Sequence, residues 1–259
     1  MSTTPAETAP GWYGKLPSLG DFASRRLPQE FIEPWDLWLA DRMAGLREIQ
    51  GESWLEPYLD SPVWRFILMP GCASSSQKHP QVGVLMASVD RVGRYFPLTL
   101  TTSLTDTPDT PAEVETLLSW LHQLEDLALD ALQDDWTIEQ LEGALAQLPS
   151  PSQPRAAPSD PLQAVRHALK LALQADSGFV PIHEVRNRAD LSLVMLEGLG
   201  PQPGSERPSV ADGHGFWWVE PLDGAQLLVS RGMPGRTEFV RMFGAQPAAQ
   251  NDDTLASPL

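Results

Sequence analysis

The sequence predicts a single α/β domain in which a mixed β-sheet carries helices on both faces, an αβα sandwich. Short apolar runs that are typical of strands occur early and late in the chain, and longer segments with helical periodicity lie between and around them. Neither half of the chain contains enough strand-like runs for a sheet of its own. With 259 residues, of which 42% are hydrophobic, the chain is long enough to bury one sizeable core.

The N-terminal part begins with a polar segment and continues into a strand and a helix. Residues 1–10 are mainly Thr, Pro, Ala and Glu, which predicts a disordered leader. Residues 11–22 indicate a short strand followed by a Gly/Pro loop. Residues 27–49 form a helix in this prediction, because apolar side chains recur at steps of three and four residues: Phe31, Trp35, Trp38, Leu39, Met43 and Leu46. We expect this aromatic stripe to face the core.

Three strand-like stretches follow, at residues 63–69, 82–89 and 95–104. Each is short and apolar or β-branched, and the first is closed by a Pro-Gly pair, which is typical of a strand end. The Ser-rich segment 71–80 is predicted to be a surface loop.

Two helices are then indicated by their capping residues. Thr110 can cap the first of them, Pro111 suits the first helical position, and Glu113 completes a capping box. The same box recurs at Thr137, which begins a second helix that stops at Pro149.

The C-terminal part alternates polar segments with predicted elements. Five prolines in residues 149–161 predict an exposed arm within the domain. The elements after it are a helix from Asp160 to near Gly178, a strand at 191–196, a polar and mobile loop at 200–215, and strands at 215–219 and 225–230. The domain therefore spans residues 11–244, and residues 245–259 are expected to form a disordered tail.

The net charge of −16 argues against nucleic acid or an anionic membrane surface as a partner, since both would repel the chain. The charge is also uneven. Residues 1–104 hold 9 Lys/Arg and 11 Asp/Glu, whereas residues 105–259 hold 9 and 23. This acidic region is either a solvated helical face or a surface that selects a basic partner, and the sequence leaves both interpretations open.

Cysteine usage and targeting signals indicate the compartment. A single Cys rules out an internal disulfide framework and fits a reducing cytosol. The N-terminus lacks the basic and apolar parts of a signal peptide, and no stretch has the roughly 18 consecutive apolar residues of a membrane-spanning helix. We therefore expect a cytoplasmic protein.

No motif for a cofactor or a metal ion is found in the sequence. Gly14 and Lys15 resemble the end of a phosphate-binding loop, but the full spacing is missing and Leu16 stands where a magnesium-binding hydroxyl is needed. The five histidines are dispersed along the chain without the spacing of zinc ligands: His79, His122, His167, His183 and His214. We predict no cofactor and no metal site.

Two pairs of residues in the sequence are candidates for a reaction centre. Cys72 with His79 lacks a third orienting group, so it is a weak candidate for a nucleophile and base. Asp21 with Asp90 is a candidate carboxylate pair, although salt bridges to nearby arginines explain both residues as well. We therefore predict no catalytic residues.

The most informative segment is the run from Ser88 to Leu98, where a turn with one acid and two arginines joins two strand-like stretches. Charged and aromatic groups thus gather on a Gly-containing turn above a rigid base, a place where binding surfaces are often built. The turn contains no nucleophile, no ligand cluster and no phosphate-binding loop. It is typical of a recognition surface.

Several sequence blocks resemble the TagF/ImpM family of type VI secretion accessory proteins. They cover about residues 11–104 in the family's order: 14–22 (GKLPSLGDF), 25–28 (RRLP), 31 with 35–39 (WDLWL), 61–66 (SPVWRF), 83–86 (GVLM) and 88–98 (SVDRVGRYFPL). Ala87 departs from the proline expected before the last block. The C-terminal half matches more loosely, through 216–218 (FWW), 232–234 (GMP) and Phe239.

The resemblance implies a non-enzymatic, cytoplasmic repressor that acts after translation on the type VI secretion system. It implies binding to the system's forkhead-associated scaffold protein, independently of the threonine phosphorylation that promotes assembly. Two alternatives stay open: a small-molecule hydrolase or other enzyme with an unrecognised site, and a structural assembly factor of the secretion apparatus. The oligomeric state is not determined by the sequence.

Family pattern and chemistry together select nine residues as partner contacts or members of an internal loop network: Asp21, Arg25, Trp64, Arg65, Asp90, Arg91, Gly93, Arg94 and Tyr95. Trp64 and Tyr95 are possible anchors, although Trp64 lies within an apolar strand that favours burial. Arg94 is the residue expected to be reachable by a partner. Gly93 is expected to supply an unusual backbone angle.

Overall fold

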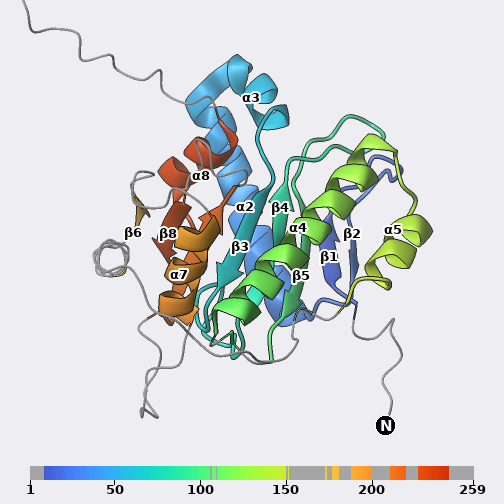
Figure 1. The fold of residues 1–259 in the computed structure, drawn as a ribbon. Helices are drawn as coiled ribbons and strands as arrows, with labels where there is room; N and C mark the ends of the chain where they lie inside the picture. The colour runs from blue at the N-terminus through green and yellow to red at the C-terminus, as the bar shows by residue number, and fades with distance from the viewer. Residues whose placement is uncertain are drawn as a thin grey trace, which may run out of the picture.

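The computed structural model places an eight-stranded sheet between two layers of helices (Figure 1). It describes residues 9–105, 107–108, 110–149, 151, 173, 177–180, 188–199, 211–219 and 227–244. The first half contains β1 (Gly11–Gly14), β2 (Ala23–Arg25), α2 (Gln29–Gln50), η1 (Gly51–Trp54), α3 (Leu55–Leu59), β3 (Trp64–Leu68), β4 (Gln81–Met86) and β5 (Leu98–Ser103). The second half contains α4 (Pro111–Gln133), α5 (Ile138–Leu145), β6 (Ser177–Val180), α7 (Arg188–Leu199), β7 (His214–Trp218), β8 (Leu227–Arg231) and α8 (Arg236–Phe243).

The sheet has the strand order β2-β1-β5-β4-β3-β7-β8-β6. Every pair of described neighbours is antiparallel, so the α/β class is confirmed, whereas the prediction of mixed strand directions is wrong. The reason lies in the connections. Strands β3, β4 and β5 follow one another through loops without a crossover helix, which a parallel pair would need.

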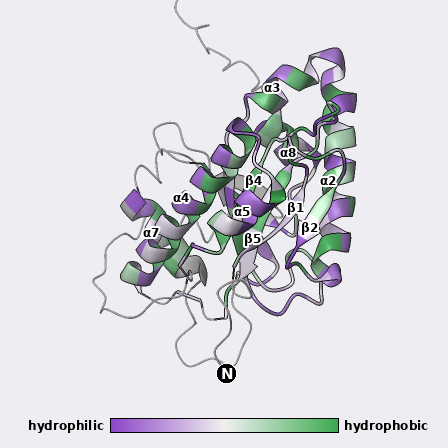
Figure 2. Cartoon of the chain, turned by 90° about the vertical axis from the view of Figure 1, so that its right-hand side faces the viewer, coloured by the Kyte–Doolittle hydropathy of each residue, from purple (hydrophilic) through white to green (hydrophobic). Residues whose placement is uncertain are grey.

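Both faces of the sheet are buried because side chains alternate along each strand. In β7, Trp217 points into the core that contains α2, α3 and α8, while Phe216 and Trp218 point into the core that contains α4, α5 and α7. Figure 2, turned by 90°, shows α4 and α7 on one side of the strands and α2 on the other. The predicted αβα arrangement is thus confirmed.

The aromatic stripe of α2 lies in the core, as the periodicity predicts. Its indoles are fully satisfied: Trp35 Nε1 donates to Thr99 Oγ1 at 2.9 Å, and Trp38 Nε1 donates to the Pro234 carbonyl at 2.9 Å. A buried tryptophan usually needs such a partner for its N–H. The stripe therefore connects α2 to β5 and to the segment before α8.

Helices begin at both of the predicted capping residues, and the second has a complete capping box. Thr110 accepts from the Glu113 N–H at the start of α4, and Thr137 exchanges both bonds of the box with Gln140 at the start of α5. The second helix ends earlier than Pro149, with α5 closing at Leu145.

Residues 191–196 form part of helix α7, so the predicted strand is wrong. A short apolar run does not distinguish a strand from a buried helix by its periodicity. The decision comes from packing on α4, because Leu191, Val194 and Met195 are all buried in the shared core and Arg188 Nε lies 3.0 Å from Glu115 Oε2.

Several short elements have no counterpart in the predictions. Strand β2 is polar and three residues long, β6 lies where the end of a helix is predicted, and η1, α3 and α8 are short helices. Their formation depends on tertiary contacts: Phe239 and Phe243 of α8, for example, stack on each other in the α2 core.

Several predictions fall on residues outside the described ranges. These are the leader 1–10 except for its last two residues, most of the arm 149–161, the helix from Asp160 to near Gly178 apart from isolated positions, most of the loop 200–215, and the tail 245–259. They stay predictions.

Gly83 in β4 tests how tightly the sheet is packed. A Cβ at this position would lie against the Leu100 carbonyl oxygen and 2.9 Å from Phe66 Cζ. We expect Gly83→Ala to lower the free energy of unfolding by about 1–3 kcal/mol or more, because strand and core must shift to make room. Urea denaturation measures this change.

The matched control is Gly143→Ala in α5. No atom lies within 4 Å of the new methyl group, and alanine favours a helix interior over glycine by up to about 1 kcal/mol. Equal losses in the two variants would contradict the packing described for β4.

Candidate functional site

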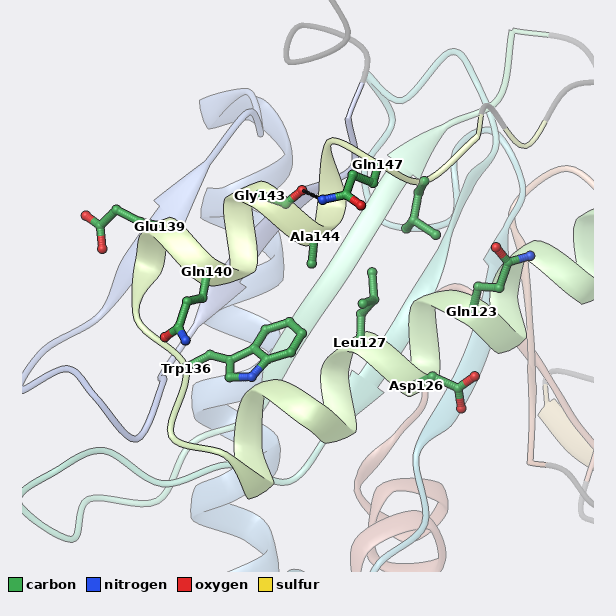
Figure 3. Close-up of a pocket in the computed structure, with 10 residues that line it drawn as sticks. Gln123, Asp126, Leu127, Trp136, Glu139, Gln140, Gly143, Ala144 and Gln147 are labelled. Atoms are coloured by element: carbon green, nitrogen blue, oxygen red, sulfur yellow. Dashed lines mark hydrogen bonds between the residues drawn. The ribbon is translucent and has the colours of Figure 1, made fainter.

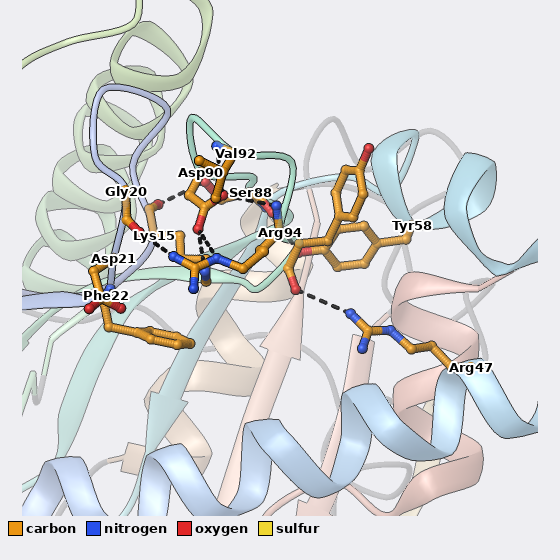
Figure 4. A network of polar contacts seen from close by, with 11 residues as sticks. Lys15, Gly20, Asp21, Phe22, Arg47, Tyr58, Ser88, Asp90, Val92 and Arg94 are labelled. Atoms are coloured by element: carbon orange, nitrogen blue, oxygen red, sulfur yellow. Dashed lines mark hydrogen bonds and ion pairs between the residues drawn. The ribbon is translucent and has the colours of Figure 1, made fainter.

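The turn between β4 and β5 is organised around the Asp90 carboxylate (Figure 4). Its Oδ1 accepts hydrogen bonds from the backbone N–H groups of Val92 at 3.0 Å and Arg94 at 2.9 Å. Gly93 closes the turn with φ of 78°, a left-handed conformation that favours glycine, as the sequence predicts. Aspartate commonly folds a turn in this way by bonding the backbone that follows it.

Asp90 also ties this turn to the loop after β1. The Lys15 ammonium lies 2.5 Å from Asp90 Oδ2, and the two side chains are 3% and 0% exposed. Arg94 Nε donates to the same oxygen at 2.8 Å. Burial alone raises the pKa of the Asp90 carboxyl, but the hydrogen bonds from Lys15, Arg94 and Val92 outweigh it and hold that pKa well below its usual range.

Backbone contacts join the two loops further. Ser88 Oγ donates to the Lys15 carbonyl at 2.8 Å, and the Arg91 N–H donates to the Leu19 carbonyl at 2.9 Å. The Arg94 guanidinium donates to the Gly20 carbonyl. The loops are therefore one hydrogen-bonded unit, although about seventy residues separate them along the chain.

Aromatic residues support this unit from the α2 side. The Tyr58 hydroxyl accepts a hydrogen bond from the Ser88 N–H at 3.0 Å and donates one to the Ser88 carbonyl at 3.1 Å. Both backbone polar groups of Ser88 are therefore bonded to the same side chain. Arg47 donates to the Tyr95 carbonyl at 3.3 Å, and its guanidinium carbon Cζ lies over the Trp54 ring, 4.5 Å from the ring centroid. The turn is thus anchored at both its start and its end.

The outer side of the two loops is exposed. We call it the loop face and define it by Asp21, Phe22, Arg91, Val92 and Arg94. Phe22 is 43% exposed and Val92 64% exposed, and the Arg94 side chain is 53% exposed. Apolar side chains beside arginines on a rigid support are typical of protein–protein interfaces.

The structure divides the predicted residues between the inside and the outside of this unit. Asp90 is internal, Arg94 belongs to the network and to the loop face, and Tyr95 is half-buried beneath it. Arg91 and Gly93 are exposed on the turn. No hydrogen bond or ion pair is described for the Arg91 side chain, so it is the arginine of the turn that is available to a partner.

Asp21 does not take part in the ion-pair network. It is exposed and accepts a hydrogen bond at 2.9 Å from the neighbouring Phe22 N–H. Lys15 occupies the role of partner to Asp90 instead, which the sequence reasoning missed because it considered that lysine only for phosphate. The signal in the sequence is a lysine directly after a strand, in the same block (residues 14–22) as Gly14.

Arg25, Trp64 and Arg65 lie away from the loop face. Arg25 is exposed in β2 and donates to the Ser24 carbonyl at 2.8 Å. Trp64 is buried, and its Nε1 donates to the Met242 carbonyl of α8 at 3.0 Å. Arg65 is buried on the opposite face of the sheet, where Glu125 of α4 lies 2.6 Å away. Trp64 and Arg65 are therefore core residues.

The structure does not support Cys72 as a catalytic nucleophile. Cys72 is buried, and burial raises the pKa of its thiol to about 12, which keeps it protonated at neutral pH. Within the described part of the chain, no three His, Cys, Asp or Glu side chains are grouped as metal ligands would be. Over the same residues, no helix has the length and apolar character needed to cross a membrane.

Both the sequence and the fold of this chain are similar to known proteins. The family model of the TagF N-terminal domain, described as type VI secretion system-associated, matches residues 11–148. The crystal structure of PA0076 from Pseudomonas aeruginosa PAO1 is similar over 97% of this chain and 98% of that one, with 31% identity and a TM-score of 0.63. No curated protein matches the chain.

Asp90→Asn tests whether the buried charge holds the loops together. The change leaves Lys15 buried without its counter-ion, so we expect the melting temperature to fall by about 5 °C or more. Lys15→Met combined with Asp90→Asn should recover part of this loss, because the buried ammonium is then removed and the remaining cation, Arg94, is half-exposed to solvent. Additive losses in the double variant would contradict the pairing.

Comparing the wild type with Asp90→Asn at different pH values tests whether the pKa of Asp90 is lowered in the folded protein. Because the pKa of Asp90 is lowered on folding, its stabilising contribution is complete above the unfolded value near 4 and is lost progressively as the pH falls from there toward the lowered folded pKa. Urea denaturation between pH 7 and pH 3 should therefore show the difference in stability between the wild type and Asp90→Asn begin to narrow at the acid end. A constant difference would contradict the lowered pKa.

The Cys72 thiol should be unreactive in the folded protein. Alkylation requires the thiolate, which is scarce at pH 8 when the pKa is about 12. We expect iodoacetamide to leave the native chain unmodified over a time in which it fully modifies the chain in guanidinium chloride, as read by intact mass. Fast modification of the native chain would restore Cys72 as a candidate nucleophile.

Proposed function

Because the chain belongs to the TagF family of type VI secretion system-associated proteins, we propose that it represses type VI secretion after translation by binding the system's forkhead-associated scaffold protein in the cytoplasm. The loop face is the proposed contact surface. Every residue that defines it lies within the part of the chain that matches the family model.

One observation carries this proposal: the loop face combines exposed arginines and apolar side chains with a rigid foundation. Arg91 and Val92 extend from a turn whose backbone is fixed by Asp90, and Phe22 packs edge-on against Phe96 at 4.8 Å between ring centroids. A surface that is already ordered loses little conformational entropy on binding. This favours a binding role for the loops.

The contact is expected to use the residues of the loop face unequally. Arg91 can donate up to five hydrogen bonds to acidic or carbonyl groups of a partner. Val92, the next residue in the turn, and Phe22, on the other loop, are exposed apolar side chains. Arg94 already bonds Asp90 and Gly20, so its substitution also disturbs the turn.

Arg91→Glu is therefore the sharpest test of the proposed contact. We expect its affinity for the purified forkhead-associated protein to fall at least about tenfold in isothermal titration calorimetry. Its melting temperature should stay within about 2 °C of the wild type, since the side chain is exposed.

Lys78→Glu is the matched control, because it makes the same change of charge at an exposed position in the loop between β3 and β4. It should bind as the wild type does. Equal affinity of all three proteins would contradict the loop face as the contact. Binding to another component of the apparatus, with none to the forkhead-associated protein, would contradict the proposed partner.

The repressor role is tested in cells that carry the secretion system. Deletion of the gene should raise the amount of secreted substrate in the medium. Expression of the wild-type protein in the deletion strain should restore repression and lower that amount again. Arg91→Glu, produced at the same level, should fail to restore repression. Unchanged secretion after deletion would contradict repression even if the two proteins bind each other.

A further inference from the structure

A second surface lies between α4 and α5, on the acidic half of the chain. The two helices leave a groove of about 610 Å³ (Figure 3). Its floor is formed by half-buried apolar side chains from both helices, the turn between them and the turn after α5: Leu127, Trp136, Ala144 and Leu148. Figure 3 shows Leu127 and Trp136 directed into the space between the helices.

Gly143 lines this groove without a side chain. It lies inside α5, where glycine is unfavourable, and it has no left-handed backbone angle that would require it. A Cβ built there meets no atom within 4 Å, so close packing does not require it either. The missing side chain instead leaves room at the rim, beside Gln140 and Gln147.

The rim is negatively charged. Asp126 and Glu139 line the groove from opposite helices, and hydrogen bonds at the start of α5 lower the pKa of the Glu139 carboxyl. Neither helix contains a Lys or Arg. Arg25 of β2 acts electrostatically on Glu139 and donates a hydrogen bond to the Ser24 carbonyl. Arg26, which follows β2, pairs with Glu142. His122 lies 3.9 Å from Asp126 on the same helix.

The backbone around the groove restricts the form of an occupant. Helices α4 and α5 satisfy their own backbone groups, so the groove has no strand edge to pair with an extended peptide. A helix brings its backbone hydrogen bonds with it and needs only an apolar stripe to cover the floor. Lysines or arginines beside that stripe would face Asp126 and Glu139.

We infer that the α4–α5 groove binds an amphipathic helix of another protein, with its apolar side chains on Trp136 and Leu127 and basic side chains at the rim. The surface is separate from the loop face and does not depend on the proposed function. It also gives the acidic half of the chain a selective role toward a basic partner.

Peptide selection on the full chain tests the inference. The probe is a phage-displayed library of random peptides of about 16 residues, enough for four helical turns. We expect enriched sequences to be net basic with apolar residues at steps of three and four. Labelled versions should bind Gly143→Ala as they bind the wild type, and Gly143→Trp at least about tenfold more weakly in fluorescence anisotropy, because the indole fills the groove.

Charge is tested separately with Asp126→Lys combined with Glu139→Lys. This variant should also bind at least about tenfold more weakly, and its residual binding should lose most of the salt dependence of the wild type. Circular dichroism confirms that each variant keeps its fold. Acidic peptides, peptides that bind Gly143→Trp as well as the wild type, or a selection that enriches nothing would each overturn the inference.

Discussion

The buried contact between Lys15 and Asp90 is the interaction on which the functional end of this protein depends. A carboxylate that is fully shielded from water is stable only with compensating charge and hydrogen bonds. Here one ammonium, one guanidinium and two backbone N–H groups supply them. Because these donors come from two loops, satisfying one charge fixes both loops against each other, and Arg91, Val92 and Phe22 are presented on a fixed surface.

The sheet makes this arrangement possible because both of its faces are covered. Tryptophans, phenylalanines and aliphatic side chains from every central strand fill one core or the other, so the strand ends cannot move independently. Gly14 contributes a close approach, with a φ of 135° and the Leu98 Cα 2.9 Å from where a Cβ would stand. The loop after β1 and the turn between β4 and β5 are therefore held in place by the strands to which they are attached.

This framework carries two separate surfaces of opposite character. The loop face exposes arginines and apolar groups, whereas α4 and α5 expose acids around an apolar groove. Ser18 links them, since its hydroxyl donates to the Trp136 carbonyl at 2.6 Å, from the loop that contains Lys15 to the turn that contains the groove's tryptophan. Family membership connects the chain to type VI secretion. The opposite charges of the two surfaces suit them to different partners.

The sequence by itself determined the elements whose signals are local. These are the aromatic stripe of α2, the N-cap of α4, the capping box of α5, the apolar central strands and the glycine in the turn after Asp90. Only the tertiary structure decided that residues 191–196 are helical, that Trp64 and Arg65 are internal, and that Lys15 rather than Asp21 belongs with Asp90. Each of these depends on which surface a residue meets across the fold, and that choice is made by burial and charge compensation between segments far apart in the chain.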